Sequence, residues 1–188
     1  TGVTLSREQL AFAKERLHKQ GLGEKANLQL CDYRDLQGQF DHIVSIEMLE
    51  AVGEAYWPTY FAKVKSLLKP GGHAGIQVIT IDNDRFARYR TGVDFIQKYI
   101  FPGGMLPSDQ ALKNEFIHAG FDLKSQQNFG VDYAETLQRW HDHFMAQTDA
   151  VKALGFDDRF LRLWKFYLAY CEAGFRQKTI DVSHYVVG

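Results

Sequence analysis

Side chains that can do chemistry follow four of the short strands that the sequence predicts. Each group contains hydroxyl, carboxylate or aromatic residues directly after an apolar or alternating run. When strands are linked by helices, ligands bind beyond the carboxyl ends of the strands, so these residues are candidates to hold a small molecule and to act on it. The groups are Thr4-Leu5-Ser6, Asp32-Tyr33, Glu47 to Glu50 and Thr80 to Asp82.

The elements that must position these groups alternate between strand and helix over the first half of the chain. Ser6 can cap the first helix with Gln9 as its capping-box partner, and Lys69-Pro70-Gly71-Gly72 ends the second helix. This order predicts an α/β fold with a parallel, doubly wound sheet, and a short apolar run such as His42–Ile46 is typical of a buried parallel strand. The predicted strands are 3–5, 27–31, 42–46 and 73–81, and the second helix is 56–68.

The second half predicts longer helices with aromatic faces. Ser108 can cap a helix that runs to His118, and Trp140 and Trp164 are expected to be core residues. The triplet His141-Asp142-His143 predicts a solvated helix face and no metal site, because residues two apart on a helix point apart. The remaining expected elements are strands at 123–129 and 179–187, one helix with Tyr133, Leu137 and Phe144 on its face, and another with Phe160, Tyr167, Leu168, Cys171 and Phe175.

Composition bounds the class of protein. The 188 residues are 45% hydrophobic and 14% aromatic, which excludes a disordered chain and predicts one domain with a real core. The formal net charge of −1 gives no basic excess, so a general role in binding nucleic acid is not expected. Two cysteines cannot form a disulfide framework, and the sequence has no signal peptide, so we expect a cytoplasmic protein.

The order of these elements resembles the S-adenosylmethionine-dependent methyltransferase fold, and finer motifs resemble the cyclopropane-fatty-acyl-phospholipid synthase family. The resemblance covers residues 1–188 and implies a Rossmann-like domain that is N-terminally incomplete, because the family's glycine-rich loop would precede Thr1. It also implies that helical segments 83–107 and 130–177 cover the substrate. The motifs are Gly2-Val3-Thr4-Leu5-Ser6 with Gln9, Asp32-Tyr33-Arg34-Asp35, Phe40 to Ser45, Glu50 with Val52-Gly53, Leu67 to Gly72, Lys98 to Gly104, Asn128-Phe129-Gly130 with Asp132-Tyr133, and Tyr167 to Cys171 with Gly174-Phe175-Arg176.

The resemblance implies methyl transfer to the double bond of an unsaturated acyl chain of a phospholipid, followed by loss of a proton that closes a cyclopropane ring. It implies a bound bicarbonate as the base. Glu50 and Tyr133 match residues that hydrogen-bond this bicarbonate, while Gln77 stands where many members have a histidine, and Ala51 replaces another histidine. A glutamate in the first turn of a helix and a core tyrosine are the plain alternatives for Glu50 and Tyr133.

The resemblance also implies residues for S-adenosylmethionine. Thr4, Leu5, Ser6 and Gln9 match positions around its ribose and methionine portions, although a helix cap alone explains Ser6 and Gln9. Asp32 and Tyr33 match positions beside the adenine. Ile46 and Glu47 are expected to contact the cofactor through their backbone.

Two further functions stay open. One is C-methylation of a lipid or of another apolar acceptor without ring closure, and the other is a non-catalytic remnant that binds lipid or protein. A basic and aromatic stretch could dock on the anionic inner face of a membrane, although a solvated helix face is the preferred interpretation. This stretch contains Arg85, Phe86, Arg88, Tyr89, Arg90, Phe95, Lys98 and Tyr99.

Overall fold

The computed structural model describes all 188 residues, which form two compact units. The first unit is Thr1–Phe40 and the second is Asp41–Gly188. That residues 1–188 belong to one domain stays a prediction.

The first unit is a strand–helix–strand segment. Parallel strands β1 (Gly2–Thr4) and β2 (Leu28–Leu30) are joined through α1 (Arg7–Lys19) and the 3₁₀ turn η1 (Gly23–Lys25). Ser6 caps α1 as predicted, because its Oγ accepts a hydrogen bond from the Gln9 backbone N at 3.1 Å. The prediction of a capping box is wrong, because the Gln9 side chain accepts a hydrogen bond from the Thr4 hydroxyl at 2.8 Å and does not bond back to the Ser6 backbone N.

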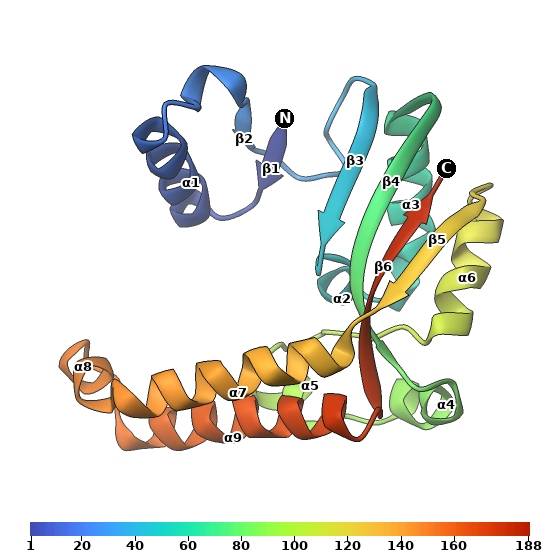
Figure 1. Cartoon of the computed structure of the whole chain (residues 1–188). Coiled ribbons are helices and arrows are strands. Elements are labelled where there is room, and N and C mark those ends of the chain that lie inside the picture. The colour runs from blue at the N-terminus through green and yellow to red at the C-terminus, as the bar shows by residue number, and fades with distance from the viewer. The chain divides into compact units, whose positions relative to one another are not determined.

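The second unit is built on a four-stranded sheet in the order β3-β4-β6-β5. The predicted parallel sheet is wrong for this unit, because β6 runs antiparallel to both β4 and β5. The arrows of β3 and β4 point the same way, and β6 enters the sheet from its other end (Figure 1). The sheet is therefore mixed. The strands are β3 (Phe40–Ile46), β4 (Leu68–Ile81), β5 (Leu123–Asn128) and β6 (Ile180–Val187).

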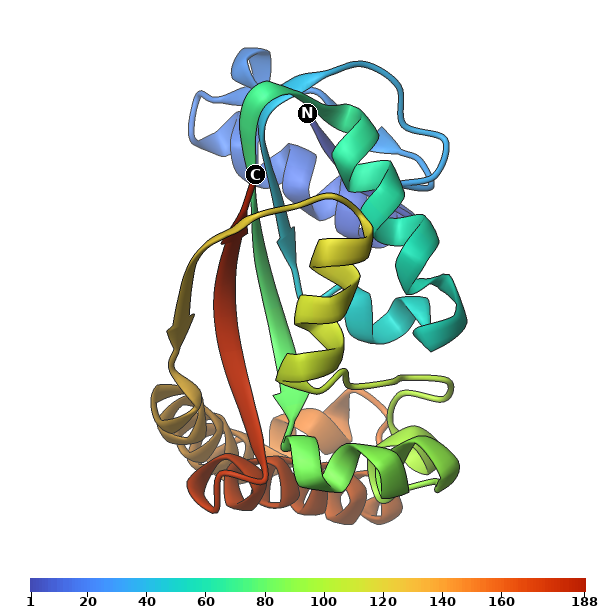
Figure 2. The same cartoon turned by 90° about the vertical axis from the view of Figure 1, so that its right-hand side faces the viewer.

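Two helices cover one face of this sheet (Figure 2). They are α3 (Trp57–Leu67) and α6 (Asp109–His118), and Ser108 caps α6 as predicted. Alternate residues of β4 are buried, which is the period-2 pattern of a strand with one core face. Gln77 and Ile79 therefore lie on the opposite face of β4. The core contains Trp57, Tyr60, Phe61, Ala74, Ile76, Val78, Leu112, Phe116 and Tyr185.

A pair of long helices lies across one end of the sheet (Figures 1 and 2). These are α7 (Gly130–Ala146) and α9 (Asp158–Arg176), linked by α8 (Thr148–Ala153). They bury a second apolar cluster around Ala134, Leu137 and Phe175. The prediction of a buried Trp140 is wrong: this side chain is 52% exposed and only the edge of its ring packs on Tyr133. The short helices are α2 (Leu49–Val52), η2 (Glu54–Tyr56), α4 (Asn83–Thr91) and α5 (Phe95–Tyr99).

Strand β3 is the edge of the four-stranded sheet. It neighbours only β4 there, and Val44 and Ile46 are 72% and 56% exposed, so the predicted burial of this strand is wrong. The next strand also differs from its prediction, because β4 begins at Leu68 and includes Lys69-Pro70-Gly71-Gly72. Gly71 supplies the positive φ of 78° that this segment requires. None of the helices is long and apolar enough to cross a membrane.

Candidate active site

Glu47 is the centre of a hydrogen-bonded cluster at the end of β3. Its Oε1 accepts from Gln77 Nε2 at 2.7 Å, and its Oε2 accepts from the Tyr133 hydroxyl at 3.0 Å. Its backbone N also donates to the Gln77 carbonyl at 2.9 Å. Glu47 has a φ of 48°, in the left-handed region that residues other than glycine seldom adopt. The structure therefore brings together two of the predicted site residues, Gln77 and Tyr133, through a third carboxylate.

His184 extends this cluster across the sheet. It is the β6 partner of Gln77 in the strand register, and its Nε2 lies 2.8 Å from Gln77 Oε1. The Glu47 carboxylate can only accept hydrogen bonds, so the Gln77 amide must direct its NH₂ group to Glu47 and its oxygen to His184. His184 Nε2 therefore carries a proton and donates a hydrogen bond to Gln77 Oε1. The imidazole also lies against Phe129, with ring centroids 4.5 Å apart.

Glu50 lies in the first turn of α2, in a buried environment. Its Oε1 accepts from the Ile79 backbone N at 2.7 Å, whereas its Oε2 is buried and has no hydrogen-bond partner. Burial raises the pKa of Glu50 from 4.5 to about 7; the hydrogen bond from Ile79 opposes this shift, and the nearby Glu47 charge adds to it. Glu50 is thus a carboxyl group that changes charge near neutral pH. An exposed glutamate in the first turn of a helix does not explain this environment.

Tyr133 joins the polar cluster to apolar surroundings. It lies in the first turn of α7, and its ring packs on Phe175 with centroids 4.9 Å apart. Burial raises the pKa of Tyr133 well above its usual range, and the charge of Glu47 adds to the shift, so its hydroxyl remains a donor. Further partly buried side chains pack on the apolar cluster around Ala134, Leu137 and Phe175, namely Ile79, Phe129, Trp164 and Tyr167. The site therefore combines carboxylates with aromatic rings that can exclude water.

The raised pKa of Glu50 predicts a specific dependence of stability on pH. The folded state keeps its proton up to about pH 7, whereas the unfolded state loses it near pH 4.5. The stability that this proton supplies is complete below pH 4.5 and is lost as the pH rises through about 7, at roughly 1.4 kcal/mol per pH unit. Between pH 5 and pH 8, Glu50→Gln should therefore gain about 2 to 3 kcal/mol in unfolding free energy relative to the wild type.

This comparison can be measured by urea unfolding followed by tryptophan fluorescence. All three tryptophans, Trp57, Trp140 and Trp164, lie in the second unit, which also contains Glu50. Parallel curves of stability against pH for the two proteins would show that the fold does not hold the Glu50 carboxyl neutral.

The residues predicted to bind a cofactor in the first unit lie at the carboxyl ends of its two strands. Thr4 and Leu30 are register partners, so the segments after β1 and β2 start side by side. The Thr4 hydroxyl accepts from the Ser6 backbone N at 3.1 Å and donates to Gln9, which leaves the Gln9 amide NH₂ as a donor. Three hydrogen bonds from Arg34, two from its side chain and one from its backbone, lower the pKa of Asp32 to about 2. Tyr33 is partly buried beside this pair.

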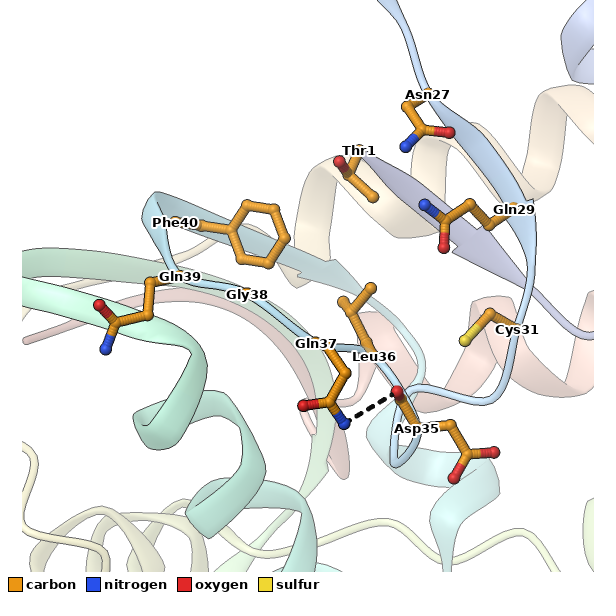
Figure 3. A pocket seen from close by; sticks show the side chains of 10 residues that line it. All are labelled: Thr1, Asn27, Gln29, Cys31, Asp35, Leu36, Gln37, Gly38, Gln39 and Phe40. Atoms are coloured by element: carbon orange, nitrogen blue, oxygen red, sulfur yellow. Dashed lines mark hydrogen bonds between the residues drawn. The ribbon is translucent and has the colours of Figure 1, made fainter.

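A pocket of about 420 Å³ lies elsewhere in the first unit (Figure 3). It is lined by Thr1, by one side of β2, and by the segment from Asp35 to Phe40. Gln37 closes part of this segment by donating to the Asp35 carbonyl at 3.2 Å. Thr4, Gln9 and Tyr33 do not line it, so it is distinct from the predicted cofactor residues.

Known proteins resemble the chain over nearly its whole length. The sequence profile of a family described as "Mycolic acid cyclopropane synthetase" matches residues 1–185. The chain belongs to this family. Tuberculostearic acid methyltransferase UfaA1 of Mycobacterium tuberculosis is 46% identical over 186 residues, which are 98% of this chain and 44% of that protein. The cyclopropane-fatty-acyl-phospholipid synthase of Escherichia coli is 37% identical over 96% of this chain and 45% of the relative.

Solved structures of the family agree with the fold. The mycolic acid cyclopropane synthase CmaA1, complexed with SAH and CTAB, superposes with a TM-score of 0.83 and 26% identity, over 99% of this chain and 68% of that one. The predicted Rossmann-like methyltransferase fold is thereby confirmed. The chain spans less than half the length of the curated relatives above.

Two side chains of the candidate site were not predicted from the sequence. Glu47 was expected to act only through its backbone, although its spacing of three from Glu50 is a signal for paired carboxylates. His184 gave no signal, because only the register of β4 and β6 places it beside Gln77. Ile46 stays a predicted cofactor contact; its side chain is exposed at the end of β3.

The basic and aromatic stretch that begins at Arg85 has basic side chains on the exposed side of α4 and an aromatic side chain in contact with the core. Arg90 pairs with Glu54 at 2.6 Å, and Phe86 stacks on the buried Trp57 with centroids 6.5 Å apart. Tyr89 is half-buried, and its hydroxyl accepts from the Leu106 backbone N at 3.4 Å. These contacts agree with the preferred interpretation of this stretch as a solvated helix face.

Proposed function

We propose that the protein transfers a methyl group from S-adenosylmethionine to the double bond of an unsaturated phospholipid acyl chain and closes a cyclopropane ring. The observation that supports this most strongly is the pairing of two carboxyl groups, Glu47 and Glu50, with the aromatic cluster around Tyr133. Membership of the cyclopropane synthetase family agrees with it. We place the reaction in the cytoplasm, with peripheral contact at the inner face of the membrane.

The reaction passes through a carbocation, and the site has the properties that a cation needs. The Glu47 carboxylate supplies negative charge in a partly buried setting, where a charge acts more strongly than in water, and Glu50 beside it changes charge near neutral pH. The half-buried rings of Tyr133 and Tyr167 pack on the apolar cluster, and aromatic rings attract positive charge through their faces. The same apolar surroundings exclude water, which would otherwise trap the cation.

The first unit supplies groups that fit the proposed cofactor. The Gln9 amide and the Thr4 hydroxyl can hydrogen-bond ribose hydroxyls, and the Tyr33 ring can lie against the adenine. Leu5, Ser6 and Asp32 follow the same strand ends. When bound, S-adenosylmethionine supplies an electrophilic methyl group.

The resemblance implied a bound bicarbonate as the base, but in this structure the expected donors of the bicarbonate site bind the Glu47 carboxylate. The Tyr133 hydroxyl and the Gln77 amide, two of its expected donors, both donate to Glu47. A second anion in this position would be repelled by the Glu47 carboxylate. The proposed reaction therefore includes no step through bicarbonate.

The test supplies the protein at its natural full length with methyl-deuterated S-adenosylmethionine and vesicles of phospholipid with monounsaturated acyl chains. Ring closure adds one carbon that keeps two of its three deuterium atoms, and the product resists mild hydrogenation. Retention of all three deuterium atoms in a product that still takes up hydrogen would support methylation without ring closure. Absence of cofactor binding would contradict both enzymatic functions and support the remnant.

Methylation without ring closure is the second candidate. Several relatives carry names of this kind, among them tuberculostearic acid methyltransferase UfaA1 and sphingolipid C9-methyltransferase 1 of Gibberella zeae, which is 33% identical over 192 residues. Gln77, in a position where many members have a titratable histidine, also agrees with it. The hydrogenation step distinguishes this candidate from the first.

A further inference from the structure

Glu47 occupies the position in this site that suits a small anion. Each of its carboxylate oxygens accepts a hydrogen bond from a side chain, Gln77 on one and Tyr133 on the other. These are the donors that a free anionic base would otherwise use. The carboxylate is brought there by a backbone conformation with a φ of 48°, which costs free energy for a residue with a Cβ atom. A strained backbone that holds a charged side chain between two donors points to a chemical role for that side chain.

We propose that Glu47 is the base that removes the proton from the methylated acyl cation, an inference that rests on the proposed function. The protein's own carboxylate thus does what a bound anion would do.

The proposed step balances in atoms and electrons. The π pair of the alkene forms a bond to the methyl carbon, and the S–CH₃ pair returns to sulfur, which leaves a neutral thioether and a cation on the neighbouring alkene carbon. A C–H bond of the new methyl group then breaks. Its electron pair closes the three-membered ring and its proton passes to a Glu47 oxygen. The cation is discharged, and Glu47 becomes a neutral carboxylic acid.

Glu47 suits this task better than Glu50. Each Glu47 oxygen accepts one side-chain hydrogen bond and keeps a further lone pair for a proton. Burial favours the neutral form of Glu50. Glu50 therefore shapes the site beside the cation, while Glu47 takes the proton.

The first test compares wild type, Glu47→Gln and the control Glu135→Gln in buffer freed of carbon dioxide. Glu135 lies on α7 close to Tyr133 in sequence but is exposed and pairs only with Arg139. We expect the wild type and the control to retain full turnover without bicarbonate. The turnover of Glu47→Gln should fall about 100-fold, a typical effect of removing a general base.

An isotope effect gives a second measurement on the same variants. With methyl-deuterated cofactor, the rate of Glu47→Gln should fall further than that of the wild type, because C–H cleavage then limits turnover. A merely structural role of Glu47 would not change this isotope effect.

The second test uses Glu47→Gly, which removes the carboxylate and suits the positive φ. Tyr133 and Gln77 then become free donors, and added bicarbonate should restore turnover to this variant while leaving the wild type unchanged. Formate serves as a second small carboxylate probe.

Three results would overturn the inference: a wild type that stops without bicarbonate, a Glu47→Gln variant as active as the wild type, or a Glu47→Gly variant that bicarbonate does not rescue although it is folded. Failure of the proposed function differs from all three, because the wild type would then transfer no methyl group to the lipid under any condition.

Discussion

Replacement of Glu50 by glutamine should reduce turnover about 100- to 1000-fold while cofactor affinity changes by less than about tenfold. Glutamine keeps an oxygen that can accept the hydrogen bond from the Ile79 backbone N. It places an NH₂ group where the buried Oε2 lies without a partner. The variant therefore keeps the packing of α2 against β4 and removes a carboxyl group from the site proposed to hold the cation. The groups proposed to bind the cofactor, Thr4, Gln9 and Tyr33, are other residues.

The measurement pairs steady-state turnover on lipid vesicles with cofactor binding by calorimetry, for wild type and Glu50→Gln at pH 7.5. A loss of affinity as large as the loss of turnover would mean that Glu50 is structural. Glu50→Asp provides a further comparison: it retains the charge but shortens the reach, so it should regain only part of the rate.

Substitution of Gly130 by alanine should destabilise the second unit by about 2 to 4 kcal/mol. A Cβ atom there would overlap Asp181 Oδ1 and lie 3.1 Å from the Phe175 ring. Asp181 Oδ1 accepts from the Gly130 and Val182 backbone N atoms at 2.9 and 2.8 Å, and its Oδ2 accepts from Asn128 at 2.7 Å. These bonds fix the start of α7, so the substitution should also displace Tyr133 and lower turnover.

Gly75→Ala is the matched control. Gly75 lies on β4 in the same unit, and a Cβ atom there would meet no heavy atom within 4 Å. Urea unfolding followed by tryptophan fluorescence should show a large loss for Gly130→Ala and a change of less than about 1 kcal/mol for Gly75→Ala. Equal changes would mean that the close approach of Gly130 to Asp181 contributes little to stability.

The sequence predicted the elements of this fold well because its local signals are strong. Ser6 and Ser108 both cap helices as predicted, and the alternation over 73–81 matches the buried face of β4. The direction of β6 could not be read, because its alternation is the same for parallel and antiparallel pairing. The exposure of Val44 could not be predicted either, because it depends on which strands lie beside β3 in the sheet.

The site was predicted in part. Glu50, Gln77 and Tyr133 were found through the resemblance, and the structure joins two of them. The side chain that joins them, Glu47, was missed because a positive φ at a glutamate has no signature in the residue types around it. His184 was missed because it comes beside Gln77 only through the pairing of β4 with β6, which are far apart in the sequence. Such contacts are properties of the fold that no single segment carries.

The amide of Gln77 connects a solvent-exposed imidazole with a half-buried carboxylate. While Glu47 is ionised, its charge fixes which way the amide is turned, and the amide in turn fixes the proton on His184 Nε2. Once Glu47 holds a proton, either orientation of the amide becomes acceptable, and the tautomer of His184 is released. The ¹⁵N resonances of one imidazole at the surface can therefore serve as a spectroscopic gauge of the charge inside the site.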